Sequence, residues 1–484
     1  MPRPHPPRSE PRVDAALILL FVLALIVRVG AAAYWQSRAD AEGVLFRFGD
    51  SYSYWDAARA AFDARPAAEV LRLESQIFRS PGYPSILQLA AWLEPERLAV
   101  LAARLLGCLL GAYCVCFVYA AARRLAGRTA AIIAGTLAAI YPGAVGMSVF
   151  ILSEALFCPL MLLNLHAAEG LVGMLAAKDA AETRGSVRKA FAIRGLAAGF
   201  LAGFAVLTKP VWILWPGAII AYLAAVACFE TIRGEAMRRV GIAAVCSMLG
   251  FVAVMMPWWV HNYKLTGHFV PTTLQVGATL YDSLHEGASG GSDEDMKFVE
   301  RFAAELKAER EAERAGQATQ SGRDAARAGT RQAAERPGEF SYELDRRLKA
   351  AAVQWTAENP SDALRLTLIK FARTWTPLPR AAQVGNDAIR WSEAVCYVLV
   401  AALAAAGLAA TGRRRVAAVY AMPLGYFAVI HMVFVGSVRY RQPSVLAACV
   451  LAGIGGAWVM VLWRERKRRK AMTETGGRRL SAPR

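Results

Sequence analysis

Ten long apolar stretches recur along the chain, separated by shorter polar or basic segments. They lie at residues 15–27, 98–122, 130–150, 156–165, 196–207, 211–229, 240–260, 394–410, 416–438 and 444–463. A helix needs about 20 mainly apolar residues to cross a membrane, so most stretches are long enough, and the fourth and fifth need their flanks. Lipid offers no partner for backbone amides, which makes each crossing helical. The pattern predicts an all-α polytopic membrane protein with about ten transmembrane helices.

Composition and charge support this interpretation. Of the 484 residues, 56% are hydrophobic and 19% are charged, whereas soluble domains average about 25% charged residues. The net charge of +18 would suggest nucleic acid for a soluble protein, but here the basic residues gather in every second loop. Basic loops stay in the cytoplasm. We therefore expect an inner-membrane protein with both termini cytoplasmic, a basic cytoplasmic tail at 464–484, and no nucleic-acid partner.

Two long segments then lie on the outer side, at residues 36–97 and 261–387, and the body at 1–463 forms a single unit. Both segments are expected to contain amphipathic helices at the membrane surface. In the second, residues 286–337 have few large apolar side chains and are expected to be flexible, as a solvated helix interrupted by disorder. The helix after Ser361 carries Lys370 and Arg373 among apolar residues, which suits the lipid headgroup region. Pro81 and Pro84 predict a surface turn rather than a helix.

Four outer positions carry the candidate chemistry. Asp50 and Glu154 supply carboxylates, Lys209 supplies a cation at a helix junction, and Arg439 and Arg441 supply two guanidinium groups at another. Charges at membrane depth are costly and commonly functional. Each residue also has a structural interpretation, since Asp50 could cap a helix and the cations could extend to lipid headgroups. Their placement on one side favours function.

Transfer of a sugar from a lipid phosphate requires such a set. The leaving phosphate gains negative charge, which Lys or Arg stabilises, and the accepting hydroxyl needs a carboxylate to take its proton. Asp50 is the predicted base, and Glu154 is predicted to orient the substrate or to support Asp50. A structural role for Glu154 at a helix start is an open alternative.

Six short motifs occur in order between residues 13 and 463. They are Gly49-Asp-Ser-Tyr52, Arg79-Ser-Pro-Gly-Tyr-Pro84, Leu152-Ser-Glu154, Leu207-Thr-Lys-Pro210, Pro257-Trp-Trp-Val-His-Asn-Tyr263 with Gly267-His-Phe-Val-Pro271, and Arg439-Tyr-Arg-Gln-Pro443. In this order the chain resembles the C-type membrane glycosyltransferases, and within them the family of dolichyl-phosphate-mannose protein mannosyltransferases and the lipid A aminoarabinose transferase.

The resemblance implies a membrane glycosyltransferase that takes a sugar, a hexose or a pentose, from a polyprenyl-phosphate donor. It places Asp50 at the catalytic centre and Lys209, Arg439 and Arg441 against the lipid phosphate. Arg79 and Tyr440 belong to the same motifs, Tyr54 follows the first motif by two residues, and all three are assigned to substrate binding. The acceptor is a glycan, a lipid or a protein. Many members have an acidic pair where this chain has Asp50 followed by serine, so Asp56 or Glu154 is expected in the second role.

No cofactor is predicted. A divalent metal is an open alternative, because Asp50, Glu154, His261 and His268 could converge, but their spacing has no metal-ligand pattern. The main alternative function is a transporter or flippase of a lipid-linked saccharide, which would show broken helices related by internal symmetry. A non-catalytic membrane scaffold is the third, and it would leave the ordered motifs without a purpose.

Overall fold

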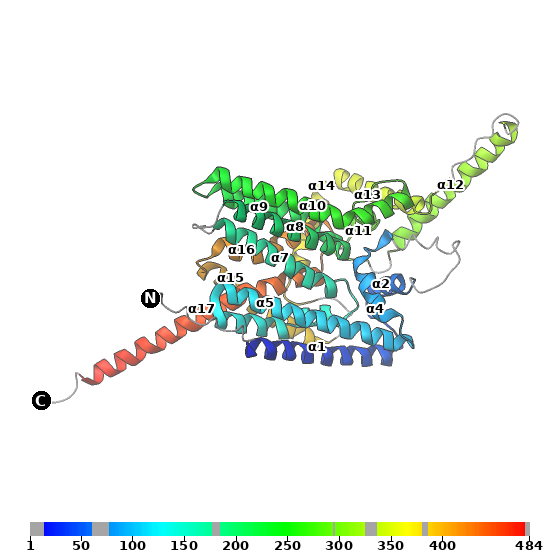
Figure 1. The fold of residues 1–484 in the computed structure, drawn as a ribbon. Helices are drawn as coiled ribbons and strands as arrows, with labels where there is room; N and C mark the ends of the chain where they lie inside the picture. Colours follow the sequence, from blue (N-terminus) through cyan, green and yellow to red (C-terminus); the bar gives the residue numbers. More distant parts are fainter. Residues whose placement is uncertain are drawn as a thin grey trace.

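The computed structural model describes residues 14–60, 77–176, 184–293, 296–324, 336–379 and 386–479, and these residues form helices and loops without a strand. The all-α class is confirmed. Within this part, nine helices are long and apolar enough to cross a membrane. They are α1 (Ala15–Glu42), α5 (Glu96–Ile140), α7 (Glu154–Ala176), α8 (Arg184–Thr208), α9 (Trp215–Cys228) extended by the 3₁₀ turn η2 (Pro210–Leu214), α10 (Arg233–Thr266), α15 (Asp387–Ala410), α16 (Arg414–Val433) and α17 (Val438–Arg479) (Figure 1).

Helix α5 accounts for two of the ten predicted crossings. Its backbone leaves the helical conformation at Ala126 and at Gly127, where φ is 82°. The two arms on either side pack against each other, because a Cβ on Gly135 would lie 3.5 Å from the ring of Tyr119. A left-handed backbone costs glycine little, so Gly127 permits this reversal. The prediction of about ten transmembrane helices therefore agrees with the nine helices of the described residues.

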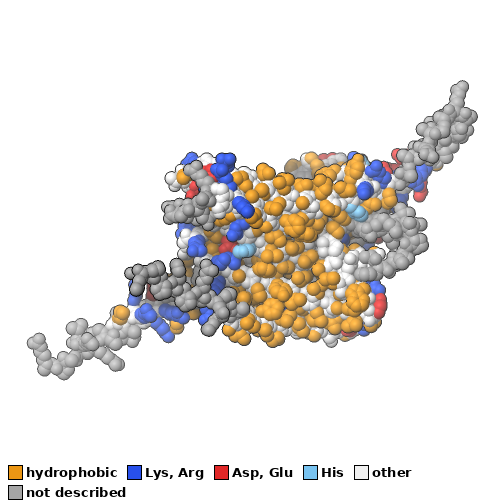
Figure 2. Space-filling model, in the orientation of Figure 1, with side chains coloured by type: hydrophobic (Ala, Val, Ile, Leu, Met, Phe, Trp, Pro, Cys, Tyr) orange, Lys and Arg blue, Asp and Glu red, His pale blue; other side chains and the backbone are white. Residues whose placement is uncertain are grey.

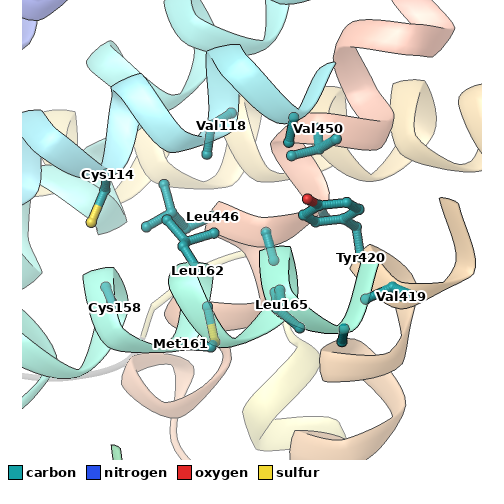
Figure 3. Close-up of a cluster of buried hydrophobic side chains, with 14 of the residues drawn as sticks. Cys114, Val118, Cys158, Met161, Leu162, Leu165, Val419, Tyr420, Leu446 and Val450 are labelled. Carbon is teal, nitrogen blue, oxygen red and sulfur yellow. The ribbon is translucent and has the colours of Figure 1, made fainter. Parts of the chain in front are cut away.

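A core shared by four helices fixes the centre of the bundle (Figure 3). Its labelled side chains come from α5, α7, α16 and α17, and all of them are buried. They are Cys114, Val118, Cys158, Met161, Leu162, Leu165, Val419, Tyr420, Leu446 and Val450. Helices α8 and α10 approach more closely still, because a Cβ on Gly199 would come within 1.8 Å of the Ser247 carbonyl oxygen. Small residues commonly allow such close crossings in membranes.

The predicted outer segments form shorter helices at one end of the bundle, which we call the cavity end. These helices are α2 (Gly49–Arg59), α4 (Gly82–Ala91), α11 (Val276–Ser283), α12 (Lys297–Asp324), α13 (Glu339–Glu358) and α14 (Pro360–Trp375). Figure 1 shows α2, α4 and α11 at the right of the bundle, with α12 projecting away from it. A further short helix, α6 (Pro142–Val149), lies between α5 and α7.

One expectation about these segments was wrong. The predicted turn at Pro81 and Pro84 is the start of α4, because a proline in the first turn loses no helical hydrogen bond. Within residues 286–337, residues 297–324 form the helix α12 and residues 287–293 form a loop against α14; 294–295 and 325–335 lie outside the described residues, so the predicted flexible stretches stay a prediction.

The opposite end of the bundle, the basic end, collects the basic loops. Asp14 pairs with Arg123 and Arg128 beside the reversal in α5, and Arg413 donates to the carbonyl oxygen of Arg124. Figure 2 shows Lys and Arg concentrated at this end, next to a broad hydrophobic belt. The predicted alternation of basic and non-basic loops therefore agrees with where the chain turns.

Candidate active site

Five charged side chains from separate parts of the sequence meet at the cavity end, and we call them the ionic cluster. Asp50 binds Arg79 through Oδ1 and Arg439 through Oδ2, each at 2.6 Å. Arg439 also donates from Nε and Nη2 to the two oxygens of Glu154, at 2.8 and 3.1 Å. Lys209 donates from Nζ to Glu154 at 2.9 Å. Arg439 thus joins the two carboxylates.

Helix starts position most of the ionic cluster. Asp50, Glu154 and Arg439 lie in the first turns of α2, α7 and α17, and Lys209 precedes η2. A carboxylate is favourable at a helix N-terminus. The predicted alternative for Asp50 does not hold, because α2 begins after Phe48 and has no side-chain cap. Glu154 and Arg439 lie in the first turns of α7 and α17, and both helices pack into the core of Figure 3 a few residues later. This packing fixes the position of Glu154 relative to Arg439.

A cavity of about 1090 Å³ opens beside the ionic cluster. Asp50, Arg79 and Arg439 line it, whereas Glu154 and Lys209 lie behind Arg439 and outside its lining. The rest of the wall includes apolar side chains from α1, α6 and α15, among them Val27, Ala31, Val145 and Ile389. The cavity therefore has a charged part and an apolar part.

Burial separates the two carboxylates. The Glu154 side chain is 0% exposed, and the Asp50 side chain is 31% exposed. Burial alone would raise the pKa of Asp50, but the charges of Arg439 and Arg79 outweigh it and hold that pKa well below its usual value. Three cations and two anions leave the ionic cluster with a charge of +1. Asp50 is the carboxylate that a substrate in the cavity can reach.

The two predicted tyrosines have different positions. Tyr440 lines the cavity and stacks on His431, with 4.4 Å between ring centroids. Tyr54 is buried outside the lining, and the guanidinium of Arg79 lies 4.8 Å from the centre of its ring. Tyr440 can therefore touch a ligand, whereas Tyr54 orients Arg79.

The structure does not bring Arg441 to the cavity. Its side chain is 0% exposed and donates to the carbonyl oxygens of Thr374, Thr376 and Pro377 at the end of α14. The prediction that Arg441 contacts the lipid phosphate is therefore wrong, because a guanidinium buried among carbonyl oxygens has no free face for a ligand. Asp56 likewise does not supply a second acidic group, since it is exposed and outside the cavity lining.

Sequence reasoning missed a polar group in the cavity wall. Glu393 accepts hydrogen bonds at Oε1 from Tyr141 and from the amide of Gln442, each at 2.7 Å. Glu393 and Gln442 both line the cavity. The available signal was an acidic residue at the start of the eighth apolar stretch.

The two histidines of the predicted outer segments pack against aromatic rings. His261 stacks on Trp258, and His268 stacks on Tyr342. In the described part of the chain, no three side chains of His, Cys, Asp or Glu are grouped so that they could hold a metal ion.

Comparison with known families assigns the chain. A sequence model described as dolichyl-phosphate-mannose-protein mannosyltransferase matches residues 18–272, which is more than half of the chain. The chain belongs to this family. The match includes Asp50, Arg79, Glu154 and Lys209, and it ends before Arg439.

Two solved structures of an archaeal oligosaccharyltransferase show the same fold at low sequence identity. The archaeal oligosaccharyltransferase AglB from Archaeoglobus fulgidus, in complex with an inhibitory peptide and a dolichol-phosphate, is 13% identical with a TM-score of 0.50, covering 97% of this chain and 52% of AglB. The Archaeoglobus fulgidus oligosaccharyltransferase in the apo form is 14% identical with a TM-score of 0.51, covering 94% of this chain and 52% of that protein. ArnT from Cupriavidus metallidurans bound to undecaprenyl phosphate is 17% identical with a TM-score of 0.38, covering 92% of this chain and 78% of ArnT. The chain thus spans about half the length of AglB. No curated protein sequence matches it.

Proposed function

We propose that this member of the family is a glycosyltransferase that moves a sugar from a polyprenyl-phosphate donor to an acceptor at the cavity end. The observation that carries the proposal is the position of Asp50, a partly exposed carboxylate on the cavity wall with Arg439 beside it. Oriented charges beside a reacting group are the largest single source of catalysis in many enzymes.

The apolar part of the cavity supports a lipid-linked donor. Val27 and Ala31 from α1, Val145 from α6 and Ile389 from α15 would contact the polyprenyl chain, and the ionic cluster would meet the phosphate and sugar. AglB is described with a dolichol-phosphate and ArnT with undecaprenyl phosphate, which is the same class of ligand.

The proposed reaction uses side chains that line the cavity. The acceptor hydroxyl attacks the anomeric carbon and gives its proton to Asp50, while the bond from that carbon to the phosphate oxygen breaks and the phosphate keeps the electron pair. Arg439 stabilises the charge that develops on the phosphate. Glu154 accepts hydrogen bonds from Arg439 behind the cavity wall, Lys209 donates to Glu154 in turn, and both act as positioning residues.

Asp50 cannot act as a strong base while two guanidinium groups bind it. A donor phosphate that accepts hydrogen bonds from Arg439 would weaken the contact at Asp50 Oδ2 and make the carboxylate more basic. Proton transfer is therefore coupled to donor binding in this proposal.

The proposed membrane orientation follows from the charges. The basic end of the bundle would face the cytoplasm and the cavity end would face the opposite side, since basic loops are retained in the cytoplasm. This orientation in an inner membrane agrees with both termini being cytoplasmic.

The test is sugar transfer or release from a panel of radiolabelled polyprenyl-phosphate hexoses and pentoses by the purified protein in lipid. Asp50→Asn should lower the rate by about 10²- to 10⁴-fold, because general-base catalysis contributes that much. Asp56→Asn is the matched control, since Asp56 lies on the same helix outside the cavity and should keep full activity.

Two outcomes would contradict the proposal. Equal activity of the Asp50→Asn variant and the wild type would remove Asp50 from the chemistry. A folded wild type that moves labelled lipid-linked saccharide across vesicle membranes, without releasing or transferring the sugar, would instead establish the flippase alternative.

A further inference from the structure

Arg373 lies on the cavity wall, although the sequence predicts it in the lipid headgroup region. It shares α14 with Lys370, which is buried and donates to the carbonyl oxygen of Val433 at 2.9 Å. The three cationic side chains in the cavity lining are Arg79, Arg373 and Arg439. Asp50 pairs with Arg79 and Arg439, whereas Arg373 forms no ion pair or hydrogen bond with the described residues.

The loop that contains Gly290 and Gly291 contacts the Arg373 side chain. A Cβ on Gly291 would lie 2.2 Å from Nη2 of Arg373, so the guanidinium packs against the bare backbone of this loop. The neighbouring Gly290 accepts a hydrogen bond at its carbonyl oxygen from the amide of Gly436, at 3.0 Å. The loop thus connects Arg373 to the segment that leads into Arg439.

The backbone beneath Arg373 is also fixed relative to α17. Arg441 donates to the carbonyl oxygens of Thr374 and Pro377, the first of which directly follows Arg373 in α14. A Cβ on Gly436 would come within 2.5 Å of the Lys370 carbonyl oxygen, which shows how closely the two segments pack. Arg373 and Arg439 are therefore held on the same wall by rigid contacts.

Charge counting indicates what Arg373 binds. The ionic cluster carries +1, which matches the single negative charge of a phosphodiester donor. When the sugar leaves, the product is a phosphomonoester whose charge approaches −2 above its second pKa of about 6. With Arg373, the charges of these six side chains sum to +2. Two further carboxylates line the cavity: Glu393, whose Oε1 lies 3.6 Å from Nη2 of Arg441, and Asp293, in the loop that carries Gly291. Arginine also presents a planar fork that suits phosphate oxygens.

We propose that Arg373 binds the phosphate of the polyprenyl carrier and holds the phosphomonoester product more strongly than the phosphodiester donor. This inference depends on the proposed function and adds to it a phosphate contact outside the ionic cluster. Arg373 takes the role that the sequence assigns to Arg441.

The test is direct binding of undecaprenyl phosphate to the full chain in phosphatidylcholine nanodiscs. Arg373→Gln should weaken binding roughly 10- to 100-fold, as expected for the loss of a charge-assisted hydrogen bond. Arg365→Gln is the matched control, because Arg365 is an exposed arginine of α14 and does not line the cavity. It should bind as the wild type does.

A second variant displaces the guanidinium and keeps its charge. Gly291→Ala puts a methyl group where Nη2 lies, and the flexible end of the arginine would move away. This variant should also bind undecaprenyl phosphate more weakly than the wild type. Between pH 5 and pH 8 the ratio of wild-type to Arg373→Gln affinity should rise for the monoester and stay constant for an undecaprenyl phosphodiester, since only the monoester gains a second charge.

The outcomes separate this inference from the proposed function. Wild-type binding with equal affinity in Arg373→Gln would overturn the inference alone, whereas a wild type that does not bind undecaprenyl phosphate would contradict both. Adding phosphatidylglycerol to the nanodiscs tests the other phosphate source. If it displaces undecaprenyl phosphate from the wild type but not from Arg373→Gln, Arg373 binds phospholipid headgroups and the assignment to the carrier is wrong.

Discussion

The two ends of the bundle each contain a group of interacting charged side chains, and the two groups differ in what surrounds them. At the cavity end the ionic cluster faces a cavity of about 1090 Å³. At the basic end Glu169 pairs with Arg124 at 2.7 Å and accepts a hydrogen bond from Tyr420, and Nδ1 of His166 lies 3.2 Å from its Oε2. We call these four residues the distal cluster. None of them lines the cavity.

The comparison shows that an ion pair near a helix end is weak evidence for function by itself. The distal cluster joins α5, α7 and α16, and its one arginine and one glutamate balance each other. The ionic cluster joins α2, α7 and α17 with the segments at Arg79 and Lys209, and it has a surplus cation and an accessible carboxylate. Surplus charge beside a cavity can interact with a ligand, whereas balanced charge without a cavity is best explained by helix packing.

The largest expected difference is in stability after one carboxylate is neutralised in each cluster. Glu154→Gln leaves Arg439 and Lys209 facing a neutral group at a 0% exposed position, which should cost about 3 kcal/mol. Glu169→Gln should cost about 1 kcal/mol or less, because its partner Arg124 is 39% exposed. Thermal unfolding in detergent measures the loss of stability in both variants. Equal losses would mean that the deeper burial of the ionic cluster does not affect stability.

A smaller effect is expected from Arg441→Lys. Lysine keeps the charge but cannot reach three carbonyl oxygens with one planar fork, so the end of α14 should loosen at a cost of about 1–3 kcal/mol. Arg390→Lys is the control, since Arg390 also donates to a carbonyl oxygen of this region, that of Pro379, from a more exposed position. If both variants unfold at the same temperature, Arg441 does not fasten α14 to α17.

Much of the fold and part of the site could be predicted from the sequence. Apolar length, loop charge and the order of motifs are local properties, and they were sufficient for the helices and for grouping Asp50, Arg79, Glu154, Lys209 and Arg439. They could not show which side of a helix end faces a cavity. Arg373 and Arg441 illustrate this limit, because both are arginines near helix termini.

Tertiary contacts decide which of Arg373 and Arg441 faces the cavity. Arg441 is surrounded by the carbonyl oxygens of Thr374, Thr376 and Pro377 on another helix, and Arg373 lies against Gly291 in a loop distant in the sequence. Neither neighbour follows from periodicity or from composition. The role of Glu393 required the same information, since its partners Tyr141 and Gln442 come from two further segments.

The smallest expected effect concerns the pH dependence of Asp50. Its pKa in the folded chain is well below the ordinary 3.8, because Arg439 and Arg79 outweigh the effect of burial. A lowered carboxyl pKa stabilises the fold above the unfolded value and loses that stabilisation as the pH falls through the folded value. The difference in melting temperature between wild type and Asp50→Asn should therefore be constant from about pH 7 to pH 5 and shrink only below about pH 4. A difference that already disappears between pH 6 and pH 5 would mean that the two arginines do not hold the carboxylate ionised, and the contrast between the two ends would then depend on the cavity alone.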